Sequence, residues 1–552
     1  MTDGGDRNII LRVEDLFLEL RNGKRVTPIL KGISFELREG EILGILGESG
    51  SGKSMTVNTI CGLIPEKSSN IRGKIYMDGE EIFGMKRKKR RNYVASHTAV
   101  ILQDAINALS PYDKIGGQLR DTARLYSPDA SEKELNAQID RTLGQMGLPG
   151  LTQAGGRYPN EFSGGMRQRI AIAMALLSPG KMLVADEPTT SLDGINQQKC
   201  VDLLRRIHDE QQKTVIYISH NLGLIAGFCN YVLVMKDGII VEQGKTEKVL
   251  NEPEHPYTRE LVGCTRRLYG YAGEISGNGI SGTSAVQDGE KELLQASHLK
   301  KSYVKMSAFR EKETVHAVKD VSFQIGHGEI VGVVGESGCG KSTVARLITC
   351  LLQADEGTIC FEGSQLNGKK EKELRELRPG FQMIQQNPFS GMNPRLTLRQ
   401  SMMAPLKYHK IGADVQERQQ ILERLFSECG LKPEYLERYP GQLSGGQLQR
   451  ACIARSLSMD PKLLIADEVV SALDVAVQEQ ILELLLQLRK QRQMGILFIS
   501  HDLAVVRRIA DRILVMKDGL IVEENTVAEL FANPQHSYTQ QLLGSMVCLN
   551  ER

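Results

Sequence analysis

Two glycine-rich runs of the chain carry the residue types that bind a triphosphate. Gly47 to Ser54 reads GESGSGKS and Gly335 to Ser342 reads GESGCGKS, and each run follows an apolar segment and precedes a helical pattern. Glycines let such a loop turn tightly so that its N–H groups converge on phosphate oxygens, while the lysine neutralises phosphate charge and the serine hydroxyl ligates Mg²⁺. One match alone is also compatible with an ordinary turn, but two matches in the same context favour nucleotide binding. The expected nucleotide contacts are Gly47, Ser49, Gly50, Gly52, Lys53, Ser54, Gly335, Ser337, Gly338, Gly340, Lys341, Ser342 and Thr343.

Acidic pairs at the ends of two apolar runs are candidates for metal binding and water activation. Asp186 and Glu187 follow MLVA, and Asp467 and Glu468 follow LLIA. A carboxylate at the end of a buried strand can hold Mg²⁺ and its waters, and the glutamate beside it can orient and polarise the attacking water. Either pair alone would suit a solvated loop, but the phosphate loops in the same chain favour catalysis.

Two histidines and two glutamines complete the candidate sites. His220 and His501 end the apolar runs that follow the acidic pairs, where an imidazole can hydrogen-bond the terminal phosphate and the glutamate. A buried core histidine is the alternative. Gln103 and Gln386 also follow apolar runs, and each is expected to ligate Mg²⁺ through its amide oxygen. The expected metal ligands are thus Ser54, Gln103, Asp186, Ser342, Gln386 and Asp467, and the expected catalytic residues are Glu187, His220, Glu468 and His501.

A second kind of anion site occurs once in each half of the chain. Ser163-Gly164-Gly165-Met166 and Ser444-Gly445-Gly446-Gln447 both stand at the start of a helical pattern. A serine and two glycines there leave a hydroxyl and N–H groups at the positive end of a helix. Each half already has a phosphate loop, so this site is redundant within one half. It is explained if each run caps the terminal phosphate bound by the other half.

An internal repeat organises the chain. His220 and His501 lie 501 − 220 = 281 positions apart, as do the runs FSGGMRQR and LSGGQLQR, while Lys53 and Lys341 lie 341 − 53 = 288 apart. The spacing predicts two copies of one domain, over residues 9–264 and 291–545. Residues 265–290 between them are rich in glycine and serine and are expected to form a flexible linker.

Short apolar runs alternate with helical patterns in each copy. EILGIL, KMLVADE, KTVIYISH and YVLVMKDG read as buried strands, and NQQKCVDLLRRIHDEQQ reads as an amphipathic helix. Alternation of this kind predicts an α/β fold with a mainly parallel sheet. Residues 105–177 are helix-rich without clear strands and are expected to form a separate helical subdomain.

The composition excludes several classes of protein. The 552 residues are 41% hydrophobic and 25% charged, with a net charge of +2, so no chain-wide basic field for nucleic acid is present. No run approaches the length of an apolar membrane span, and the start lacks the pattern of a signal peptide. The ten cysteines are scattered without zinc or iron–sulfur spacing. These features predict a cytosolic protein.

Taken together, the ordered motifs resemble those of the ATP-binding cassette (ABC) family. The set comprises phosphate loop, Q-loop glutamine, LSGGQ-like signature, acidic strand end, Ser-x-Leu-Asp loop and switch histidine, and it covers nearly the whole chain twice. The resemblance implies two P-loop nucleotide-binding domains. Each would have a mainly parallel RecA-like sheet core, an antiparallel β subdomain and an α-helical subdomain. It also implies ATP hydrolysis with ATP and Mg²⁺ as cofactors.

In that family two cassettes close head to tail around two ATP molecules. The resemblance therefore implies that site one joins the loop at Lys53 to the signature Ser444 to Gln447. Site two would join the loop at Lys341 to the signature Ser163 to Met166. With both glutamates and both histidines present, two hydrolytic sites are expected.

The two copies differ at positions that bear on these sites. Tyr303 matches the family's adenine-stacking aromatic residue, whereas Leu20 takes that place in the first copy, which predicts weaker ATP binding at site one. Met166 replaces the signature glutamine, and Val469-Val470 replace the Pro-Thr that follows Glu187.

A matching tail follows each cassette. EHPYTREL at Glu254 to Leu261 and QHSYTQQL at Gln535 to Leu542 resemble the tails of ATPases from oligopeptide, dipeptide and nickel importers. Members of that group often carry a cysteine cluster after this segment. Here only Cys264 and Cys548 follow, so no iron–sulfur cluster is expected. The resemblance implies two transmembrane permease subunits, an extracytoplasmic solute-binding protein and a peripheral location on the cytoplasmic face of the inner membrane.

Other ABC proteins with two cassettes remain alternatives. Translation factors carry a long charged helical linker, DNA-repair ATPases carry zinc modules or coiled coils, and tandem sugar-importer ATPases lack the His-x-Tyr-Thr tail. A carbon–phosphorus-metabolism subunit is a further non-transport alternative. The basic run Met85 to Tyr93, MKRKKRRNY, reads as a solvated helix face or as a contact with lipid or a membrane subunit. Peptides, glutathione, nickel and metal–chelator complexes all remain open as cargo.

Overall fold

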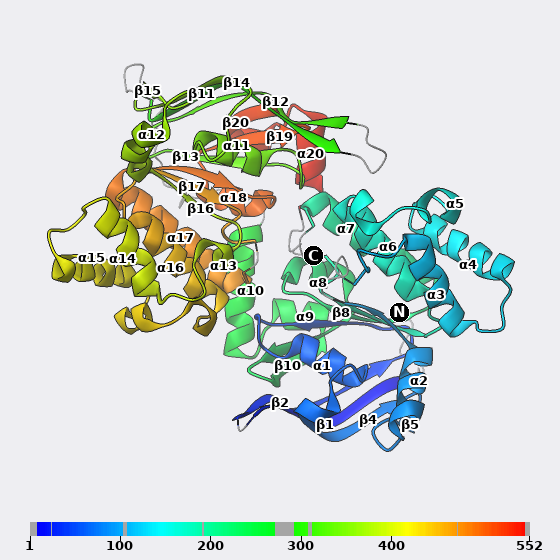
Figure 1. Ribbon diagram of the computed structural model, residues 1–552. Helices are drawn as coiled ribbons and strands as arrows, with labels where there is room; N and C mark the ends of the chain where they lie inside the picture. Colours follow the sequence, from blue (N-terminus) through cyan, green and yellow to red (C-terminus); the bar gives the residue numbers. More distant parts are fainter. Residues whose placement is uncertain are drawn as a thin grey trace. The chain divides into compact units, whose positions relative to one another are not determined.

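The computed structural model describes residues 8–23, 25–102, 108–189, 192–270, 292–306, 312–471 and 473–546. The chain divides into two compact units, whose elements are labelled in Figure 1. Unit 1 comprises Met1–Leu192, Asn196–Arg266 and Glu551–Arg552, and unit 2 comprises Asp193–Ile195 and Arg267–Asn550. Each unit contains one copy of the sequence repeat.

The sheet core of unit 1 has six strands in the order β10-β9-β3-β8-β7-β6. All neighbours in it are parallel except β9 and β10, which form an antiparallel pair. The central strands are buried on both faces, as expected for a parallel sheet covered by helices. Its strands are β3 (Ile42–Leu46), β6 (Thr98–Ile101), β7 (Met182–Asp186), β8 (Thr214–Ile218), β9 (Tyr231–Lys236) and β10 (Ile239–Lys245).

A second sheet of unit 1 is antiparallel and has the order β2-β1-β4-β5. Its strands are β1 (Ile9–Asn22), β2 (Arg25–Arg38), β4 (Ser69–Met77) and β5 (Glu80–Glu81). Side chains from this sheet, from α1 (Lys53–Ile60) and from the parallel core belong to one buried hydrophobic cluster. The helix that follows the first phosphate loop is therefore fixed to both sheets.

Unit 2 repeats this architecture within a single ten-stranded sheet of order β15-β14-β11-β12-β20-β19-β13-β18-β17-β16. One pair, Asp320 with Leu520, joins its antiparallel part to its parallel part. The same link exists in unit 1 as one bond from Lys31 N–H to the Gly238 carbonyl, at 2.9 Å. The strands are β11 (Leu294–Met306), β12 (Lys312–Ile325), β13 (Ile330–Val334), β14 (Glu356–Phe361), β15 (Ser364–Gln365), β16 (Phe381–Ile384), β17 (Leu463–Asp467), β18 (Gly495–Ile499), β19 (Arg512–Lys517) and β20 (Leu520–Thr526).

Helices cover the sheets and form a separate group in each unit, and this arrangement confirms the expected α/β fold of two cassettes. The helical subdomains consist of α3 (Ile115–Tyr126), α4 (Glu132–Gln145), α5 (Leu151–Ala154) and α6 (Gly164–Leu176) in unit 1, and of α13 (Pro388–Gly391), α14 (Leu398–Tyr408), α15 (Val415–Glu428) and α16 (Gly445–Leu457) in unit 2. The other helices are α2 (Arg87–His97), α7 (Gly194–Gln211), α8 (Leu222–Phe228), α9 (Thr246–Asn251), α10 (Pro256–Tyr269), α11 (Lys341–Ile348), α12 (Glu371–Leu377), α17 (Val475–Arg492), α18 (Leu503–Ile509), α19 (Val527–Ala532) and α20 (Ser537–Gly544). In the described part of the chain, no helix has the length and apolar character to cross a bilayer.

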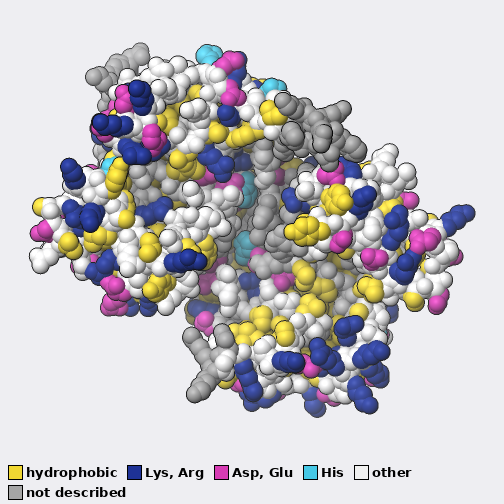
Figure 2. All heavy atoms as spheres, viewed as in Figure 1, with side chains coloured by type: hydrophobic (Ala, Val, Ile, Leu, Met, Phe, Trp, Pro, Cys, Tyr) yellow, Lys and Arg dark blue, Asp and Glu magenta, His cyan; other side chains and the backbone are white. Residues whose placement is uncertain are grey.

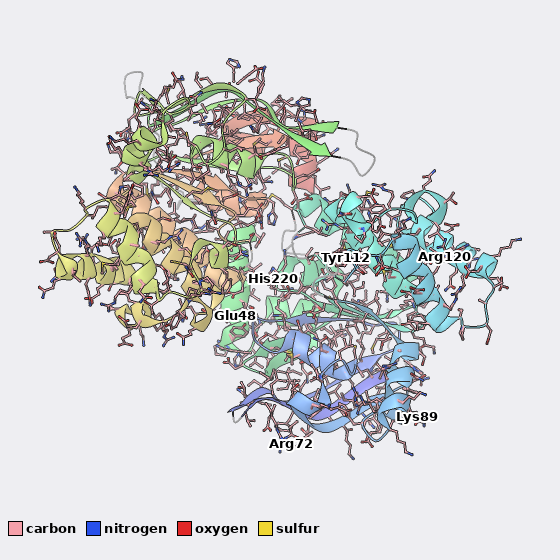
Figure 3. All side chains as sticks on the ribbon, viewed as in Figure 1. Glu48, Arg72, Lys89, Tyr112, Arg120 and His220 are labelled. Atoms are coloured by element: carbon pink, nitrogen blue, oxygen red, sulfur yellow. The ribbon has the colours of Figure 1, made fainter. Side chains whose placement is uncertain are left out.

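The basic run singled out in the sequence forms most of α2. Its lysines and arginines are mostly exposed, and only Val94 of the helix is buried. Lys89 points away from the ribbon in Figure 3, and dark blue side chains gather over this part of unit 1 in Figure 2. This exposure is compatible with both interpretations of the run, a solvated helix face and a contact with lipid or a membrane subunit.

The predicted linker begins inside a helix, because α10 continues past residue 265 to Tyr269. The chain passes from unit 1 to unit 2 within this helix, and residues 271–291 lie outside the described residues. Arg267 makes a two-pronged ion pair with Glu479 of α17, and the Tyr269 hydroxyl donates to Asp502 at 2.8 Å. The end of α10 is thus part of unit 2.

A repeated helix cap gives a test of local stability. The Asn221 side chain accepts hydrogen bonds from the N–H groups of Gly223 and Leu224 at the start of α8, and Asp502 caps α18 in the same way. Asn221→Ala should destabilise α8 by about 1 kcal/mol, because orphan N–H groups lose their acceptor. Hydrogen exchange of the α8 amides should become faster. Asn221→Asp, which copies unit 2, should leave the exchange unchanged, and equal exchange in both variants would contradict the prediction.

Candidate active site

The register of parallel strands brings the candidate residues of each unit to one edge of its sheet. In unit 1, Ile45 pairs with Ile218, and Ile218 pairs with Asp186. In unit 2, Ile499 pairs with both Val333 and Asp467. The aspartate of the acidic pair is itself one of these aligned residues, and the phosphate loop, the glutamate and the histidine follow the aligned positions. These groups therefore lie next to one another at the carboxyl edge of the sheet.

Each phosphate loop is curled around its own lysine. Lys53 Nζ donates to the carbonyls of Gly47 and Glu48, both at 2.8 Å, and Lys341 makes the equivalent contacts in unit 2. Gly47 has a φ of 153°, and a Cβ there would lie 2.2 Å from the Met235 carbonyl oxygen. The first glycine of the loop is therefore required for its close approach to β9.

A serine and an aspartate, both candidate metal ligands, are hydrogen-bonded to each other in each unit. Ser54 Oγ donates to Asp186 Oδ1 at 2.9 Å, and Ser342 Oγ donates to Asp467 Oδ1 at 3.0 Å. Hydroxyl and carboxylate oxygens at a phosphate loop suit Mg²⁺, which prefers hard oxygen ligands and few protein contacts. The predicted ligand pairs are therefore brought together in both units.

Burial controls the protonation of these aspartates in the absence of metal. Desolvation raises the pKa of Asp186 to about 6, and the neighbouring Glu187 charge adds to this, while the Ser54 hydrogen bond and the Lys53 charge oppose it. Desolvation also raises the pKa of Asp467. Since a metal ligand must be deprotonated, Mg²⁺ binding at these carboxylates displaces a proton at low pH.

The candidate catalytic glutamates have left-handed backbone conformations, with φ of 44° at Glu187 and 49° at Glu468. Such a conformation is uncommon for a residue with a Cβ and costs energy unless the surroundings hold it. The Glu187 N–H is held by the Ile218 carbonyl at 3.1 Å, and the Glu468 N–H by the Ile499 carbonyl at 2.9 Å. Each glutamate is therefore turned out of the strand direction just after the aspartate that is the candidate metal ligand.

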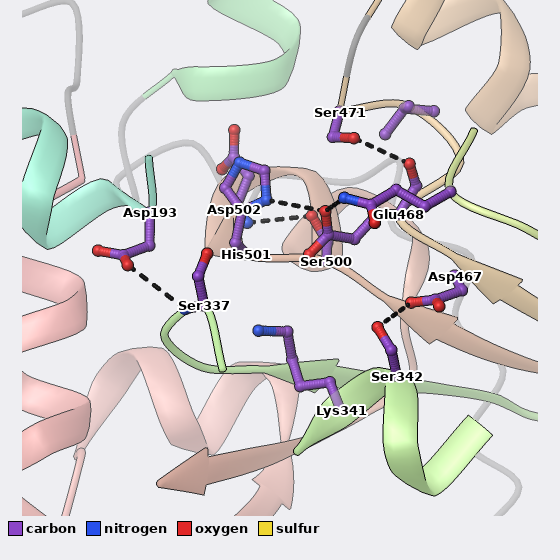
Figure 4. Close-up of polar contacts among 12 residues, drawn as sticks. Asp193, Ser337, Lys341, Ser342, Asp467, Glu468, Ser471, Ser500, His501 and Asp502 are labelled. Carbon is purple, nitrogen blue, oxygen red and sulfur yellow. Dashed lines mark hydrogen bonds and ion pairs between the residues drawn. The ribbon is translucent and has the colours of Figure 1, made fainter. Parts of the chain in front are cut away.

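A histidine, His501 (Figure 4), and a glutamine contact the glutamate of unit 2. His501 Nδ1 lies 3.7 Å from Glu468 Oε2, and Gln386 Nε2 donates to the same oxygen at 2.6 Å. Burial alone would raise the pKa of Glu468, but His501, the Lys341 charge and the Gln386 amide lower it overall. Burial alone would lower the pKa of His501, but Glu468 and the Asp502 charge raise it overall. The glutamate is thus kept ionised and able to accept a proton.

Unit 1 has the same acid–histidine pair. His220, labelled in Figure 3, places Nδ1 3.5 Å from Glu187 Oε2. Gln103, predicted as a metal ligand, lies outside the described residues. Metal binding by Gln386 stays a prediction, because its amide nitrogen is seen in contact with Glu468.

The two signature runs start helices, as predicted, but they are capped differently. Ser163 is the N-cap of α6 and Ser444 is the N-cap of α16, and each accepts a hydrogen bond from the third residue of its helix at 3.3 Å. Gln447 Oε1 in turn accepts a second hydrogen bond from the Ser444 N–H at 3.1 Å. Met166 has no group that can do so. The substitution noted in the sequence therefore removes one side of a capping box.

Tyr303 lies on β11 with 37% of its surface exposed, so its ring is accessible; its stacking on adenine stays a prediction. Leu20 of β1 is half-buried. One contact to each phosphate loop was not predicted from the sequence. The Tyr257 hydroxyl accepts a hydrogen bond from the Glu48 N–H at 3.0 Å, and the Tyr538 hydroxyl accepts one from the Glu336 N–H at 2.8 Å. The equal spacing of these tyrosines in the repeat was the available signal.

The fold and the side chains at the carboxyl edge of each sheet define a P-loop nucleotide hydrolase that is present twice in one chain. The family model described as "ABC transporter" matches residues 30–190 and 318–471. The chain therefore belongs to the ABC transporter family, and it is an ATPase of that family. The model described as "Oligopeptide/dipeptide transporter, C-terminal region" matches residues 241–288 and 522–552, which include both tails.

Similar proteins with both cassettes are found in several bacteria. The glutathione import ATP-binding proteins GsiA of Salmonella typhimurium and Escherichia coli K12 are both 37% identical to this chain over 99% of its length and 90% of theirs. The protein of the same name from Pectobacterium atrosepticum is 36% identical over 97% of this chain and 89% of its own length. The two-cassette arrangement is therefore shared along nearly the whole chain.

Replacement of Asp186 by asparagine tests the burial of this carboxylate. Its pKa of about 6 lies above the ordinary value near 3.9, so the native state binds the proton more tightly than the unfolded chain does. Ionisation then destabilises the native state: the effect is absent below about pH 4 and complete above about pH 6. At pH 7.5, without Mg²⁺ or nucleotide, Asp186→Asn should stabilise unit 1 by about 1–3 kcal/mol while impairing hydrolysis.

Calorimetric unfolding at pH 7.5 and pH 4 measures this difference, which should shrink at the lower pH. Asp121→Asn, at an exposed position of α3, serves as the control and should change neither profile. A lower unfolding temperature of Asp186→Asn at pH 7.5 would contradict the assigned burial effect.

Proposed function

We propose that this ABC ATPase energises an importer of short peptides, with glutathione as the first solute to test. The observation that carries the proposal is the His-x-Tyr-Thr tail, which is present after both cassettes and is matched in both by the oligopeptide/dipeptide transporter model. The GsiA relatives, which cover nearly the whole chain, are named for glutathione import. These names favour a peptide over nickel, a metal chelate or a sugar.

An import ATPase of this type acts together with other chains. We expect two transmembrane permease subunits that form the solute path and a solute-binding protein on the outer side. The ATPase would bind the permeases at the cytoplasmic face of the inner membrane as a peripheral subunit. Two ATP sites of related geometry in one chain suit a pair of permeases, because each cassette can drive one of them.

Hydrolysis in each cassette follows from the contacts of its own side chains. The loop N–H groups and Lys53 or Lys341 would hold the phosphates and neutralise their charge. Glu187 or Glu468, each just after the aspartate at the end of its strand, would accept a proton from the attacking water. The paired histidine holds the glutamate and can donate to the terminal phosphate. Mg²⁺, held by Ser54 and Asp186 or by Ser342 and Asp467, would neutralise charge that develops on the phosphates.

Each signature helix is proposed to serve ATP bound by the other cassette. Support comes from chemistry: a phosphate loop and a signature helix are two anion sites, and the loop with its lysine already supplies the donors for one triphosphate. Ser163 and Ser444 are exposed at their helix starts, as a contact with a nucleotide held elsewhere requires. This pairing gives two composite sites.

Paired substitutions distinguish composite sites from separate ones. In a Glu187→Gln/Glu468→Gln background, which slows hydrolysis, Lys53→Ala with Ser444→Arg disables one composite site and should retain about half of the ATP that stays bound through gel filtration. Lys53→Ala with Ser163→Arg disables both composite sites and should retain almost none. The reverse pattern would show that each signature serves its own cassette.

Solute uptake into vesicles tests the proposal that the chain drives an importer. Vesicles that contain the chain with its co-purifying membrane subunits and solute-binding protein should take up labelled glutathione only with Mg²⁺ and ATP. Uptake of a sugar instead of peptides, or co-purification with ribosomes or nucleic acid, would overturn the proposal that the chain drives a peptide importer.

Glu187→Gln and Glu468→Gln should each slow ATP turnover, by about 10²- to 10⁴-fold at the altered site, because a proton acceptor is lost. A variant that keeps the full rate identifies a non-catalytic site.

A further inference from the structure

The repeated His-x-Tyr-Thr tail forms the start of a helix in both units. It begins α10 in unit 1 and α20 in unit 2. His255 Nδ1 accepts the Tyr257 N–H at 3.2 Å, and His536 Nδ1 accepts the Tyr538 N–H at 3.1 Å. The histidine thus caps the helix and fixes the backbone of the tyrosine two residues later.

A carboxylate from the antiparallel strand beside the core anchors the tail. Glu242 of β10 accepts the N–H groups of Glu254 and His255 at 2.9 and 3.0 Å. Glu523 of β20 accepts the equivalent pair, both at 2.9 Å. Burial alone would raise the pKa of each glutamate, but these backbone donors help to lower the pKa overall. The tail is therefore tied to the sheet by an ionised group.

Each tyrosine reaches the second residue of its phosphate loop. The Tyr257 hydroxyl accepts a hydrogen bond from the Glu48 N–H, and the Glu48 carbonyl accepts a hydrogen bond from Lys53 Nζ. In unit 2 the Tyr538 hydroxyl and the Lys341 ammonium hold the same residue, Glu336, in the same way. The backbone of this loop residue is thus held by the tail through its N–H and by the phosphate-binding lysine through its carbonyl oxygen.

The tyrosine rings are held rigidly. Tyr257 is 3% exposed and Tyr538 is 1% exposed. Lys236 Nζ, at the end of β9, lies 4.6 Å from the centre of the Tyr257 ring, and Lys517 Nζ lies 5.0 Å from that of Tyr538. Buried rings with a cation over their face lose little further freedom when the hydroxyl makes its hydrogen bond. The hydroxyl therefore presents a fixed acceptor to the loop.

We propose that Tyr257 and Tyr538 are positioning residues for ATP, one for each phosphate loop, and that the tail tunes nucleotide affinity by holding the loop in its phosphate-binding shape. A loop that is already ordered loses less entropy when the triphosphate binds, so affinity rises. The tail couples to nucleotide binding through one hydrogen bond in each cassette. The inference rests on ATP binding by these loops and is independent of the imported solute.

Tyrosine-to-phenylalanine substitution separates positioning from packing. Phenylalanine keeps the ring, its burial and its lysine neighbour, but leaves the N–H of the loop residue without its hydroxyl acceptor. In the full chain, Tyr257→Phe/Tyr538→Phe should raise the KM for ATP about three- to tenfold, the range that the loss of one hydrogen bond gives, with kcat changed less than about twofold. Mg²⁺·ATP binding to Tyr257→Phe in a Lys341→Ala background, and to Tyr538→Phe in a Lys53→Ala background, assigns the effect to each site.

Tyr93→Phe is the matched control, because this hydroxyl also bonds a backbone group, the Met77 carbonyl at 3.0 Å, away from the phosphate loop. Its KM for ATP should equal that of the unaltered chain. An unchanged KM in the double variant, with or without a lower unfolding temperature, would reduce the tail to a packing element and overturn the proposal. An equal rise in KM for Tyr93→Phe would do the same. Failure of glutathione uptake would leave these ATP measurements unaffected.

Discussion

The aligned carboxyl ends of three parallel strands are the constraint on which each ATP site depends. The rows Ile45–Ile218–Asp186 and Val333–Ile499–Asp467 fix where the loop, the carboxylates and the histidine leave the sheet. A slip of one residue in any pair would turn the strand's side chains to the opposite face and separate the serine from its aspartate. Buried apolar strands on both sides make such a slip costly, so the stability of the core also fixes the geometry of the chemistry.

The left-handed glutamates show how this constraint is used. A strand that continued in extended form past Asp186 would carry the next side chain to the other face of the sheet. The positive φ at Glu187 and Glu468 breaks that alternation, and the bonds to the carbonyls of β8 and β18 hold the conformation. The carboxylate can then meet a histidine from the neighbouring strand. Local strain is thus balanced by the sheet that supports it.

Much of this could be predicted from the sequence, because the relevant signals are local. The glycine-lysine-serine runs, the apolar strands that end in Asp-Glu and the equal spacing of the two copies predict the α/β fold and the position of most site residues. The positive φ of the glutamates could not be predicted, since glutamate has no preference for that conformation. Nor could the tyrosine contacts, because residues 48 and 257 come together only when the sheet has formed, and His-x-Tyr-Thr reads locally as a loop.

The boundary after the first cassette illustrates the same limit. Composition places a linker from residue 265, yet α10 extends to Tyr269, and its last residues bind Glu479 and Asp502. The first-copy counterparts of these partners, 281 positions earlier, are the uncharged Gln198 and Asn221. The charged acceptors that bind this segment are therefore present in the second copy alone, and the glycine and serine content of the segment does not predict the contacts that it makes with them.

This junction has a consequence for dividing the protein into separate halves. A C-terminal half that began at residue 291, the predicted start of the second domain, would lack Arg267 and Tyr269, and would remove the Arg267 guanidinium from Glu479, whose side chain is only 6% exposed. A cut after Gly270 would keep the end of α10 intact, but Arg267 and Tyr269 would then belong to the N-terminal fragment. Independent expression of the C-terminal half therefore calls for a start upstream of Arg267, with some overlap between the two fragments.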